Sequence, residues 1–556
     1  MKTRLAILMA LFSGFLSAQV EMNYSYEMKY GDGKQVERTA SDNPVTSDYS
    51  YFENLLDINT YFGDHIYLYT QLEYSNPPVF GYSRTRIDSM INRFYLEYSH
   101  EKFNVKLGDL YELFGRGLSF YTMQDQTIDH DNSIRGLALN YSLKENLEIS
   151  TLVGTGEYAY RSKPTYRKSD YQINNNVILG SIDYETGPLG SMQFICLNKT
   201  TFLIYNFIKD LRGDGSNIGE ELADRTSIID FLSSTGNNDT LYQQNINLNW
   251  NLYIGPIEVY LDKSWIQYDK IYGDEVFGSR FYTSVYTEFF DAGITYEYKN
   301  YYSPHLIKSI SNPPIVYREG NSILASRNVH SMNFGNEIGH QIDLNRNLFV
   351  NMNLAANLSL AHRHKSGDMA SISYSDVLSM KDEDEMYDYY PFRQVYLAMN
   401  GWALSERLYY QVGMDHFTEF YGGKNTSALT FPTHWVWKLS SGSSFTIYME
   451  AQEKIEKQRD LSDFTLDKEA KYLNYYSSLS YNHMGKWVVT SFYDQETKNS
   501  TSNKWMGADL SYKISSETQI SIFYGSQKGG LVCANGICAE QPGFEDGYKI
   551  TLRSLF

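Results

Sequence analysis

The sequence has no long uninterrupted apolar run after its first twenty positions, whereas a membrane-spanning helix needs about 20 apolar residues in a row. Helical membrane proteins are therefore excluded. Proline and cysteine are also scarce, with 12 and 3 residues in a chain of 556. Basic residues are outnumbered, 48 against 66 acidic, for a net charge of −18. This balance disfavours nucleic acid as a partner, because phosphate contacts need clustered lysine and arginine.

Aromatic residues are abundant. They make up 15% of the chain and include 50 tyrosines, although only 42% of all residues are hydrophobic. Disordered chains are poor in aromatics, so disorder does not fit. Many tyrosines in a polar chain are typical of a transmembrane β-barrel, in which only every second strand residue faces lipid.

Residues 1–18 have the pattern of a secretory signal peptide. Lys2 and Arg4 precede the apolar stretch from Leu5 to Phe15, and small residues end at Ala18. Strand-like alternation starts within a few residues of Ala18, which leaves no room there for a globular plug domain of about a hundred residues. We expect one domain, a barrel over residues 19–556.

Apolar and polar residues alternate along many segments, as in a strand with one apolar and one polar face. Near the N-terminus the apolar set is Met22, Tyr24, Tyr26, Met28 and Tyr30. Further on, Ile246, Leu248, Trp250 and Leu252 alternate with asparagines. A helix is excluded because no face at i, i+3, i+4 collects the apolar residues.

The connections alternate between short and long, which is the rule for outer-membrane barrels with short periplasmic turns and long extracellular loops. Short turns are expected at 63–64, 99–102, 144–146, 187–190, 255–256, 346–347, 440–443 and 515–517, and long loops at 31–48, 112–132, 206–240, 302–339 and 525–546. Both termini then lie on the short-turn side, which requires an even strand number.

The tally gives an all-β, single antiparallel barrel of about 24 strands, within a range of 22–26. Its least certain hairpin pairs Phe281–Thr287 with Ala292–Tyr298. Such a barrel would be ~48 Å across, given ~4.8 Å between strands and a tilt near 40°. Inward-folded loops or a partner must restrict so wide a hole.

The C-terminal segment has the same alternation and ends in an aromatic residue. Tyr548, Ile550, Leu552 and Phe556 share one parity. This pattern is similar to the signal that the barrel-assembly machinery reads, so we expect that machinery and outer-membrane lipid as partners in a Gram-negative cell.

Cys533 and Cys538 flank a short segment that contains Asn-Gly, a favoured turn pair. In an exported chain this spacing favours a disulfide at a loop tip over a metal site, for which two thiolates would supply only half the ligands. Cys196 lies in an apolar stretch and is expected to be a packed thiol.

The loop Glu112–Asn132 is the leading candidate for a constriction. Its charged residues and those of the flanking strands, Asp109, Arg116, Asp125, Asp129, Asp131 and Arg135, could set solute selectivity as rings of charge do in pores. A structural salt-bridge network is the alternative. Asp109 and Arg135 are assigned to the lumen face, because arginine in the lipid midplane costs ~2–4 kcal/mol.

Glu297 and Lys299 lie on the polar face of their segment and could line the same lumen, or could be ordinary solvated lumen charges. No catalytic motif is present, whether a metalloprotease helix, a nucleophile elbow or a phosphate loop. We therefore expect no enzyme, no cofactor and no metal site.

Several segments resemble an uncharacterised family of large Gram-negative outer-membrane barrels, filed as a domain of unknown function. They are Gly108–Leu118, Asp131–Gly136, Ile294–Lys299, Asn312–Pro314, Arg318-Glu319 and Gly529–Cys538. The resemblance implies an outer-membrane location and a barrel fold, and it brings no activity with it.

Two functions are the leading candidates, and a barrel hydrolase, which no motif supports, comes third. One is a porin-like channel for polar solutes, with an inward-folded loop at the constriction. The other is a non-conducting surface receptor, adhesin or secretion-complex component that binds a periplasmic or surface protein through its loops.

Overall fold

The fold is taken from a computed structural model of the chain. It describes residues 20–38, 44–76, 79, 91–125, 130–160, 171–203, 240–271, 274–303, 310–320, 322–364, 389–421, 423–439, 442–459, 467–498, 501–534, 537–541 and 543–556. The expected signal peptide and Asp129 lie outside these residues.

Twenty-four antiparallel strands form one continuous sheet. They are β1 (Val20–Arg38), β2 (Pro44–Phe62), β3 (Ile66–Ser75), β4 (Ile91–His100), β5 (Phe103–Leu110), β10 (Ile134–Lys144), β11 (Leu147–Tyr160), β12 (Tyr171–Glu185), β13 (Ser191–Leu203), β14 (Thr240–Ile254), β15 (Ile257–Ile271), β16 (Asp274–Phe289), β17 (Ala292–Tyr302), β18 (Asn336–Phe349), β19 (Met352–His362), β20 (Phe392–Ala403), β21 (Leu408–Tyr421), β22 (Lys424–Lys438), β23 (Ser444–Arg459), β24 (Asp467–His483), β25 (Trp487–Lys498), β26 (Thr501–Lys513), β27 (Thr518–Gln527) and β30 (Gly543–Leu555). The expected strand number is confirmed.

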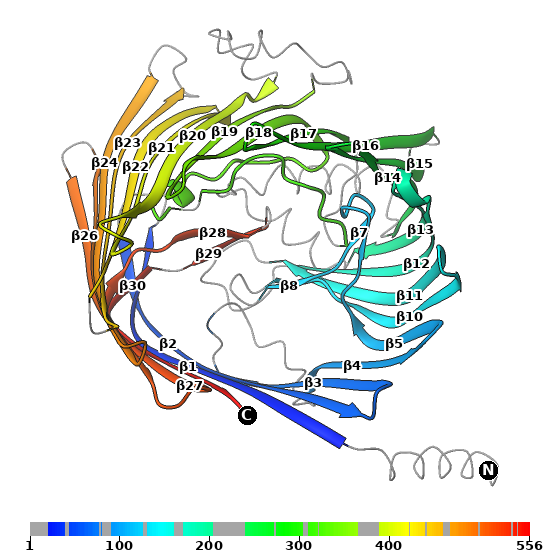
Figure 1. Ribbon diagram of the computed structural model, residues 1–556, viewed down its shortest axis with the longest axis horizontal. Coiled ribbons are helices and arrows are strands. Elements are labelled where there is room, and N and C mark those ends of the chain that lie inside the picture. The colour runs from blue at the N-terminus through cyan, green and yellow to red at the C-terminus, as the bar shows by residue number, and fades with distance from the viewer. Residues whose placement is uncertain are drawn as a thin grey trace.

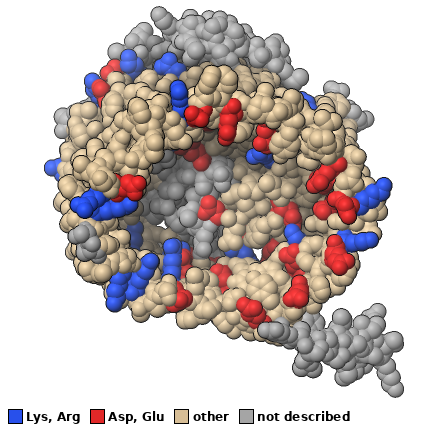
Figure 2. Space-filling model, viewed as in Figure 1, with Lys and Arg blue, Asp and Glu red and all other residues tan. Residues whose placement is uncertain are grey.

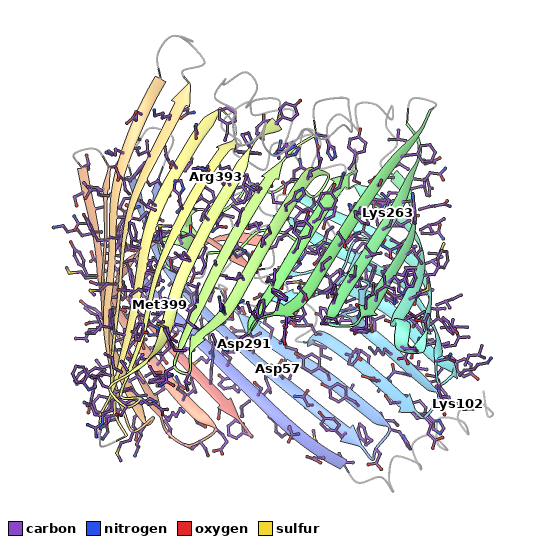
Figure 3. The ribbon with its side chains drawn as sticks, turned by 45° about the horizontal axis from the view of Figure 1, so that its top comes forward. Asp57, Lys102, Lys263, Asp291, Arg393 and Met399 are labelled. Atoms are coloured by element: carbon purple, nitrogen blue, oxygen red, sulfur yellow. The ribbon has the colours of Figure 1, made fainter. Side chains whose placement is uncertain are left out.

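The sheet closes on itself. β1 pairs with β30 as well as with β2, and β30 pairs with β27 (Figure 1). Beyond the last strand, the backbone N–H of Phe556 donates to the carbonyl of Tyr24 at 2.8 Å. Closure removes every free edge, so each wall strand has a hydrogen-bonded neighbour on both sides. Figure 3 shows the strands crossing the wall obliquely.

Polarity is reversed relative to a water-soluble protein. On β14 the apolar Tyr242, Ile246 and Leu248 are exposed on the outer face, whereas Asn245 and Asn247 are buried inside. Alternation of the sequence produces this directly, because neighbouring side chains of a strand point to opposite faces. An outward apolar band with a polar interior is the arrangement that a lipid bilayer requires.

The short turns lie at one end of the barrel. The least certain hairpin is confirmed as β16–β17, and its two turn residues, Phe290 and Asp291, have φ of 49° and 58°. Positive φ at both central residues gives the turn a twist that matches the strands. The turn expected at 346–347 was misplaced, because β18 continues to Phe349 and the chain reverses at 350–351.

The long loop expected at 31–48 was also wrong, since β1 and β2 extend through most of it. The expectation rested on the charged and glycine-containing composition of this segment, which includes Gly31 and Gly33. In the structure both are strand residues covered by aromatic rings, because a Cβ would lie 2.4 Å from the Tyr51 ring at Gly31 and 2.7 Å from the Phe544 ring at Gly33. These glycines make room for rings and do not form a turn.

The C-terminal residues fall where the alternation placed them. Tyr548 and Phe556 are exposed on the outside, and Ile550 and Leu552 are half-buried opposite Tyr30 and Met28 of β1. The strand that carries the expected assembly signal therefore also closes the barrel.

Smaller elements lie within the ring formed by the wall (Figure 1). These strands are β6 (Leu113–Phe114), β7 (Phe120–Tyr121), β8 (Gln124–Asp125), β9 (His130–Asp131), β28 (Gly530–Ala534) and β29 (Ile537–Gln541). Two 3-10 turns complete the fold, η1 (Gly187–Leu189) and η2 (Ala325–Arg327). Figure 2 shows the barrel hollowed at its centre, with acidic side chains around the hollow.

Candidate functional site

Residues 111–125 and 130–133, here called the inner loop, fold into the barrel and bring their own apolar core. Leu118 and Phe120 are fully buried, and the rings of Phe114 and Phe120 meet edge to face with centroids 5.8 Å apart. Phe114 and Phe120 pack with the inward residues Leu110 and Ile134 of the flanking strands. Burial of this kind stabilises the loop in one position by about 1.5–3 kcal/mol for each large side chain.

Hydrogen bonds fasten the tip of the inner loop to the wall. The N–H of Gly115 donates to the Gln193 side chain at 2.8 Å, and the N–H of Arg116 donates to the Asp262 carboxylate at 3.1 Å. Gly115 has φ of 61°, and a Cβ there would lie 2.8 Å from that same carboxylate. Glycine is therefore required by both conformation and space.

Arg116 itself is exposed within the barrel. Its guanidinium carbon lies 4.9 Å from the centre of the Tyr260 ring, a cation–π contact. Its charge also acts on the carboxylates of Asp262 on β15 and Glu297 on β17. The structure thus brings together Arg116 and Glu297, two of the residues expected at the constriction.

Asp109 and Arg135 are not on the lumen face, which corrects the expectation. They pair across β5 and β10 with the same parity as Leu107 and Leu137, which are exposed on the outside. The Arg135 guanidinium binds the Asp109 carboxylate at 2.8 Å, and the other carboxylate oxygen accepts the Phe94 N–H at 2.9 Å.

The position of this pair along the strand explains why it is tolerated. Arg135 lies ten residues before the turn at Glu145, hence ~25 Å above it at a tilt near 40°. That height is the outer edge of an apolar band ~25 Å tall, where a charged side chain costs little. The ion pair therefore belongs to the rim of the barrel.

Asp131 holds the base of the inner loop. Its carboxylate accepts from the Arg93 guanidinium at 2.7 and 2.8 Å and from the Ser133 N–H at 2.9 Å. This is the structural network that the sequence left open as an alternative. Asp125 is half-buried and lies opposite His130 in the β8–β9 pair.

Lys299 is fully buried and has a structural position. Its ammonium pairs with the Glu337 carboxylate at 2.5 Å and donates to the carbonyl of Ile315. It is therefore not an open lumen charge, in contrast to Glu297, which is half-buried and bonded to the Tyr282 hydroxyl.

A second insert, residues 310–335, here called the strap, lies within the long loop expected at 302–339, but its course along the inner wall was not predicted. It is described apart from residue 321 and runs along the inner wall from β17 to β25. Glu450 of β23 accepts from the Ser322 hydroxyl and the Leu324 N–H, each at 2.9 Å, and from the Ile323 N–H at 2.6 Å. No local pattern could reveal these contacts, which join residues more than 120 positions apart.

Arginines fix the rest of the strap. Arg318 stacks on Tyr396 with its guanidinium carbon 3.8 Å from the ring centre. Arg327, in the last turn of η2, forms a two-bond ion pair with Asp494 of β25. Paired hydrogen bonds of this type are among the stronger polar contacts in proteins.

His330 lies at the end of the strap between two carboxylates. Its Nδ1 is 2.6 Å from Glu419 and its Nε2 is 3.3 Å from Glu337, while its ring stacks on Phe392 at 3.9 Å. Burial alone would lower the pKa of His330, but the two carboxylates outweigh it and raise the pKa. Only the protonated ring can donate from both nitrogens.

The hairpin β28–β29 is a third insert. Cys533 and Cys538 are direct partners in its register, so the backbone pairing suits the expected disulfide, which stays a prediction. At its base, the Lys528 ammonium lies 2.5 Å from the Glu496 carboxylate of β25. Cys196, expected to be packed, is instead exposed on the outer face beside Phe194.

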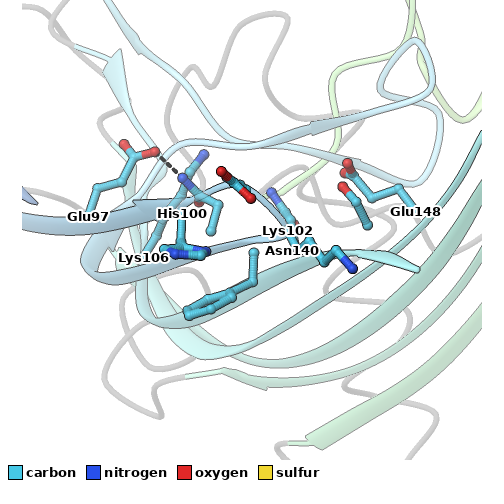
Figure 4. A pocket seen from close by; sticks show the side chains of 10 residues that line it. Glu97, His100, Lys102, Lys106, Asn140 and Glu148 are labelled. Carbon is cyan, nitrogen blue, oxygen red and sulfur yellow. Dashed lines mark hydrogen bonds between the residues drawn. The ribbon is translucent and has the colours of Figure 1, made fainter. Parts of the chain in front are cut away.

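A polar pocket lies near the short-turn end, between β4, β5, β10 and β11 (Figure 4). Glu97, Lys106, Asn140 and Glu148 contribute to its lining. Lys106 also pairs with Glu112 of the inner loop, with its ammonium 2.7 Å from the carboxylate. Within the described part of the chain, no cluster of three or more His, Cys, Asp or Glu side chains could hold a metal ion.

The closed, even-numbered antiparallel wall with apolar residues outside and polar residues inside is an outer-membrane β-barrel of the Gram-negative type. The chain belongs to the family described as "Family of unknown function (DUF6029)", whose model matches residues 1–182 and 290–556. No curated protein matches the sequence. Among the described residues, no helix is long and apolar enough to cross a membrane.

Three solved structures with a similar fold are distant in sequence. A ferric enterobactin receptor mutant (PfeA) from Pseudomonas aeruginosa has 7% identity and a TM-score of 0.46, covering 97% of this chain and 81% of that one. The siderophore receptor PirA from Acinetobacter baumannii has 8% identity, a TM-score of 0.45 and the same coverage. The P pilus usher PapC translocation pore has 10% identity and a TM-score of 0.38, with coverages of 97% and 99%.

Proposed function

We propose that this barrel is a channel for polar solutes, with its lumen restricted by the inner loop and the strap. The observation that carries the proposal is the position of Arg116. Its loop is fastened to the wall, yet its guanidinium is exposed inside the barrel opposite Asp262 and Glu297. Opposed charges at a narrow point act on the ions and polar solutes that pass.

The structure supplies a matched pair of variants to test this. Arg116→Ala removes a cation that faces the lumen, whereas Arg135→Ala removes one on the outer face at the rim. We expect Arg116→Ala to shift the reversal potential in a planar bilayer towards cation selectivity, because Glu297 then lacks an opposing charge. Arg135→Ala should leave both conductance and selectivity as in the wild type.

Identical single-channel properties for wild type and Arg116→Ala would overturn the constriction. A shift with Arg135→Ala would mean that the two arginines do not face opposite sides. Circular dichroism of each variant shows whether the barrel is folded before either result is interpreted.

The second candidate is a non-conducting surface receptor, adhesin or secretion-complex component. It is favoured by the number of bonds that hold the strap, since Glu419, Glu450 and Asp494 fix it to three different wall strands. Silence of the folded protein in a bilayer, together with co-purification of a stoichiometric protein partner, would favour this candidate. Neither proposal includes a catalytic step.

A further inference from the structure

Two buried cations lie on the inner face of the wall. Lys199 on β13 shares its parity with the buried Ile195 and Leu197, and Arg280 on β16 lies between outward neighbours. The side chains are almost inaccessible: Lys199 is 4% exposed and Arg280 1%. They are close enough for their charges to repel each other.

Neither cation has an acidic partner among the residues that the structure describes. Arg280 donates from one terminal nitrogen to the carbonyl of Leu118 at 2.6 Å and to the Ser311 hydroxyl at 3.3 Å. Its Nε and its other terminal nitrogen have no hydrogen-bond partner. The inner loop, through Leu118, and the strap, through Ser311, therefore close over a guanidinium that keeps an edge of unused donors.

An amide supplies a further donor between the two cations. Asn245 of β14 is 2% exposed, and its Nδ2 also has no partner, whereas its Oδ1 accepts from Gln243 at 2.8 Å. Gln243 lies opposite Lys199 in the register. Asn247 lies two positions from Asn245 along β14. It pairs with Ser264 of β15, and Ser264 pairs with Arg280 of β16. Across the sheet, Lys199 is therefore level with Gln243 and Arg280 is level with Asn247, and Asn245 lies between these two levels.

Buried charges are costly without a counter-charge, and isolated donors are costly without an acceptor. Here the described residues provide cations and donors together, and no carboxylate among them bonds to either cation. Asp262, two positions from Ser264 on β15, is instead bonded to the Asn247 amide and to the Arg116 N–H. We propose that Lys199, Asn245 and Arg280 form a binding site for a small oxyanion inside the barrel wall. The planar guanidinium edge suits two oxygens of one carboxylate or phosphate group, which a single halide ion cannot supply.

The site does not depend on conduction, so it can be tested in detergent. Inorganic phosphate is titrated into the refolded full-length protein by calorimetry, after dialysis against chloride at matched ionic strength. We expect saturable binding, and we expect Lys199→Met to weaken it at least tenfold. Lys199 forms no hydrogen bond or ion pair with another described residue, and methionine keeps most of its stem, so this variant leaves the packing largely intact.

Arg280→Gln is the second variant and should weaken phosphate binding to a similar extent. Lys263→Met is the matched control, because Lys263 is a cation on the outer face, beside the exposed Trp265. It should bind phosphate as the wild type does. Acetate as an alternative probe distinguishes a carboxylate site from a phosphate site, and binding of either is consistent with the proposal.

The absence of saturable binding of both phosphate and acetate to the folded wild type would overturn the proposal. So would wild-type affinity in both Lys199→Met and Arg280→Gln. If chloride competes as strongly as the oxyanions, the choice of an oxyanion is wrong.

Discussion

The carboxylate of Glu450 is the contact whose removal should release the strap most directly. It is 3% exposed and accepts three hydrogen bonds from consecutive strap residues, Ser322, Ile323 and Leu324. In Glu450→Ala these donors lose their acceptor while the wall around them is unchanged. We expect the strap to open locally and the barrel to remain folded.

The size of the effect follows from the three bonds. A hydrogen bond to a charged group contributes about 1.5–3 kcal/mol. Water that enters the space left by the side chain recovers part of this, so the local opening free energy should fall by about 3–4 kcal/mol. Since 1.4 kcal/mol is a factor of ten, the population of the open strap should rise by roughly 10²–10³-fold.

Amide hydrogen exchange measures this population. Protection of the Ile323 and Leu324 amides should decrease by roughly 10²–10³-fold in Glu450→Ala, and by less in Glu450→Gln, which keeps one acceptor oxygen. Glu453→Ala is the control on the same strand, because that carboxylate is about half exposed and pairs with Lys471 away from the strap. Unchanged protection at both amides in Glu450→Ala would refute the reasoning.

Three further predictions test other parts of the account. Gly115→Ala should weaken the attachment of the inner loop by at least about 1 kcal/mol, because φ is positive there; hydrogen exchange of the inner loop measures this, and wild-type protection would contradict it. His330→Gln should lower the free energy of unfolding below pH 6.5, where His330 is charged in both the folded and the unfolded protein. This loss should disappear as the pH rises through the raised pKa of His330 in the folded protein. Denaturation at a series of pH values measures the loss, and a loss independent of pH would contradict a charged ring. Phe556→Ala should reduce the amount of folded barrel in the outer membrane, measured by fractionation, if the C-terminal strand is the assembly signal; an undiminished amount would remove that role.

Most of the wall could be predicted because its signal is local. The alternation of Ile246 and Leu248 with asparagines predicts which side of the strand faces lipid. In the structure both apolar residues are exposed on the outer face, and the neighbouring asparagines are buried inside. Turn chemistry was less informative. Gly31 and Gly33 suggested a loop, although in the structure they are strand residues beneath the rings of Tyr51 and Phe544.

The candidate site could be predicted only in part. The inner loop and Arg116 were found because a glycine-flanked arginine in a long loop is visible in the sequence. Asp109 and Arg135 were assigned to the lumen because they are charged. They share strand parity with Leu107 and Leu137, however, and those leucines face outside. Parity was the stronger signal, because a paired charge at the rim of the apolar band has little cost.

The contacts of the strap and the arrangement of the buried cations could be found only from the structure. Nothing near Ser322 in the sequence indicates that Glu450 will bind it, since that contact depends on which wall strands face each other across the barrel. Lys199 could have been noticed as a charge between Leu197 and Thr201 on a buried parity. Its relation to Arg280, however, is set by the register of four strands.

The most direct test of the central claim is the single-channel conductance of the refolded wild-type barrel in a planar bilayer. We predict steady, ion-selective steps, smaller than an empty barrel ~48 Å across would give, because the inner loop and the strap occupy part of the lumen. A folded, inserted protein that passes no current would contradict the channel, and its loops would then be examined as the binding surface of a receptor.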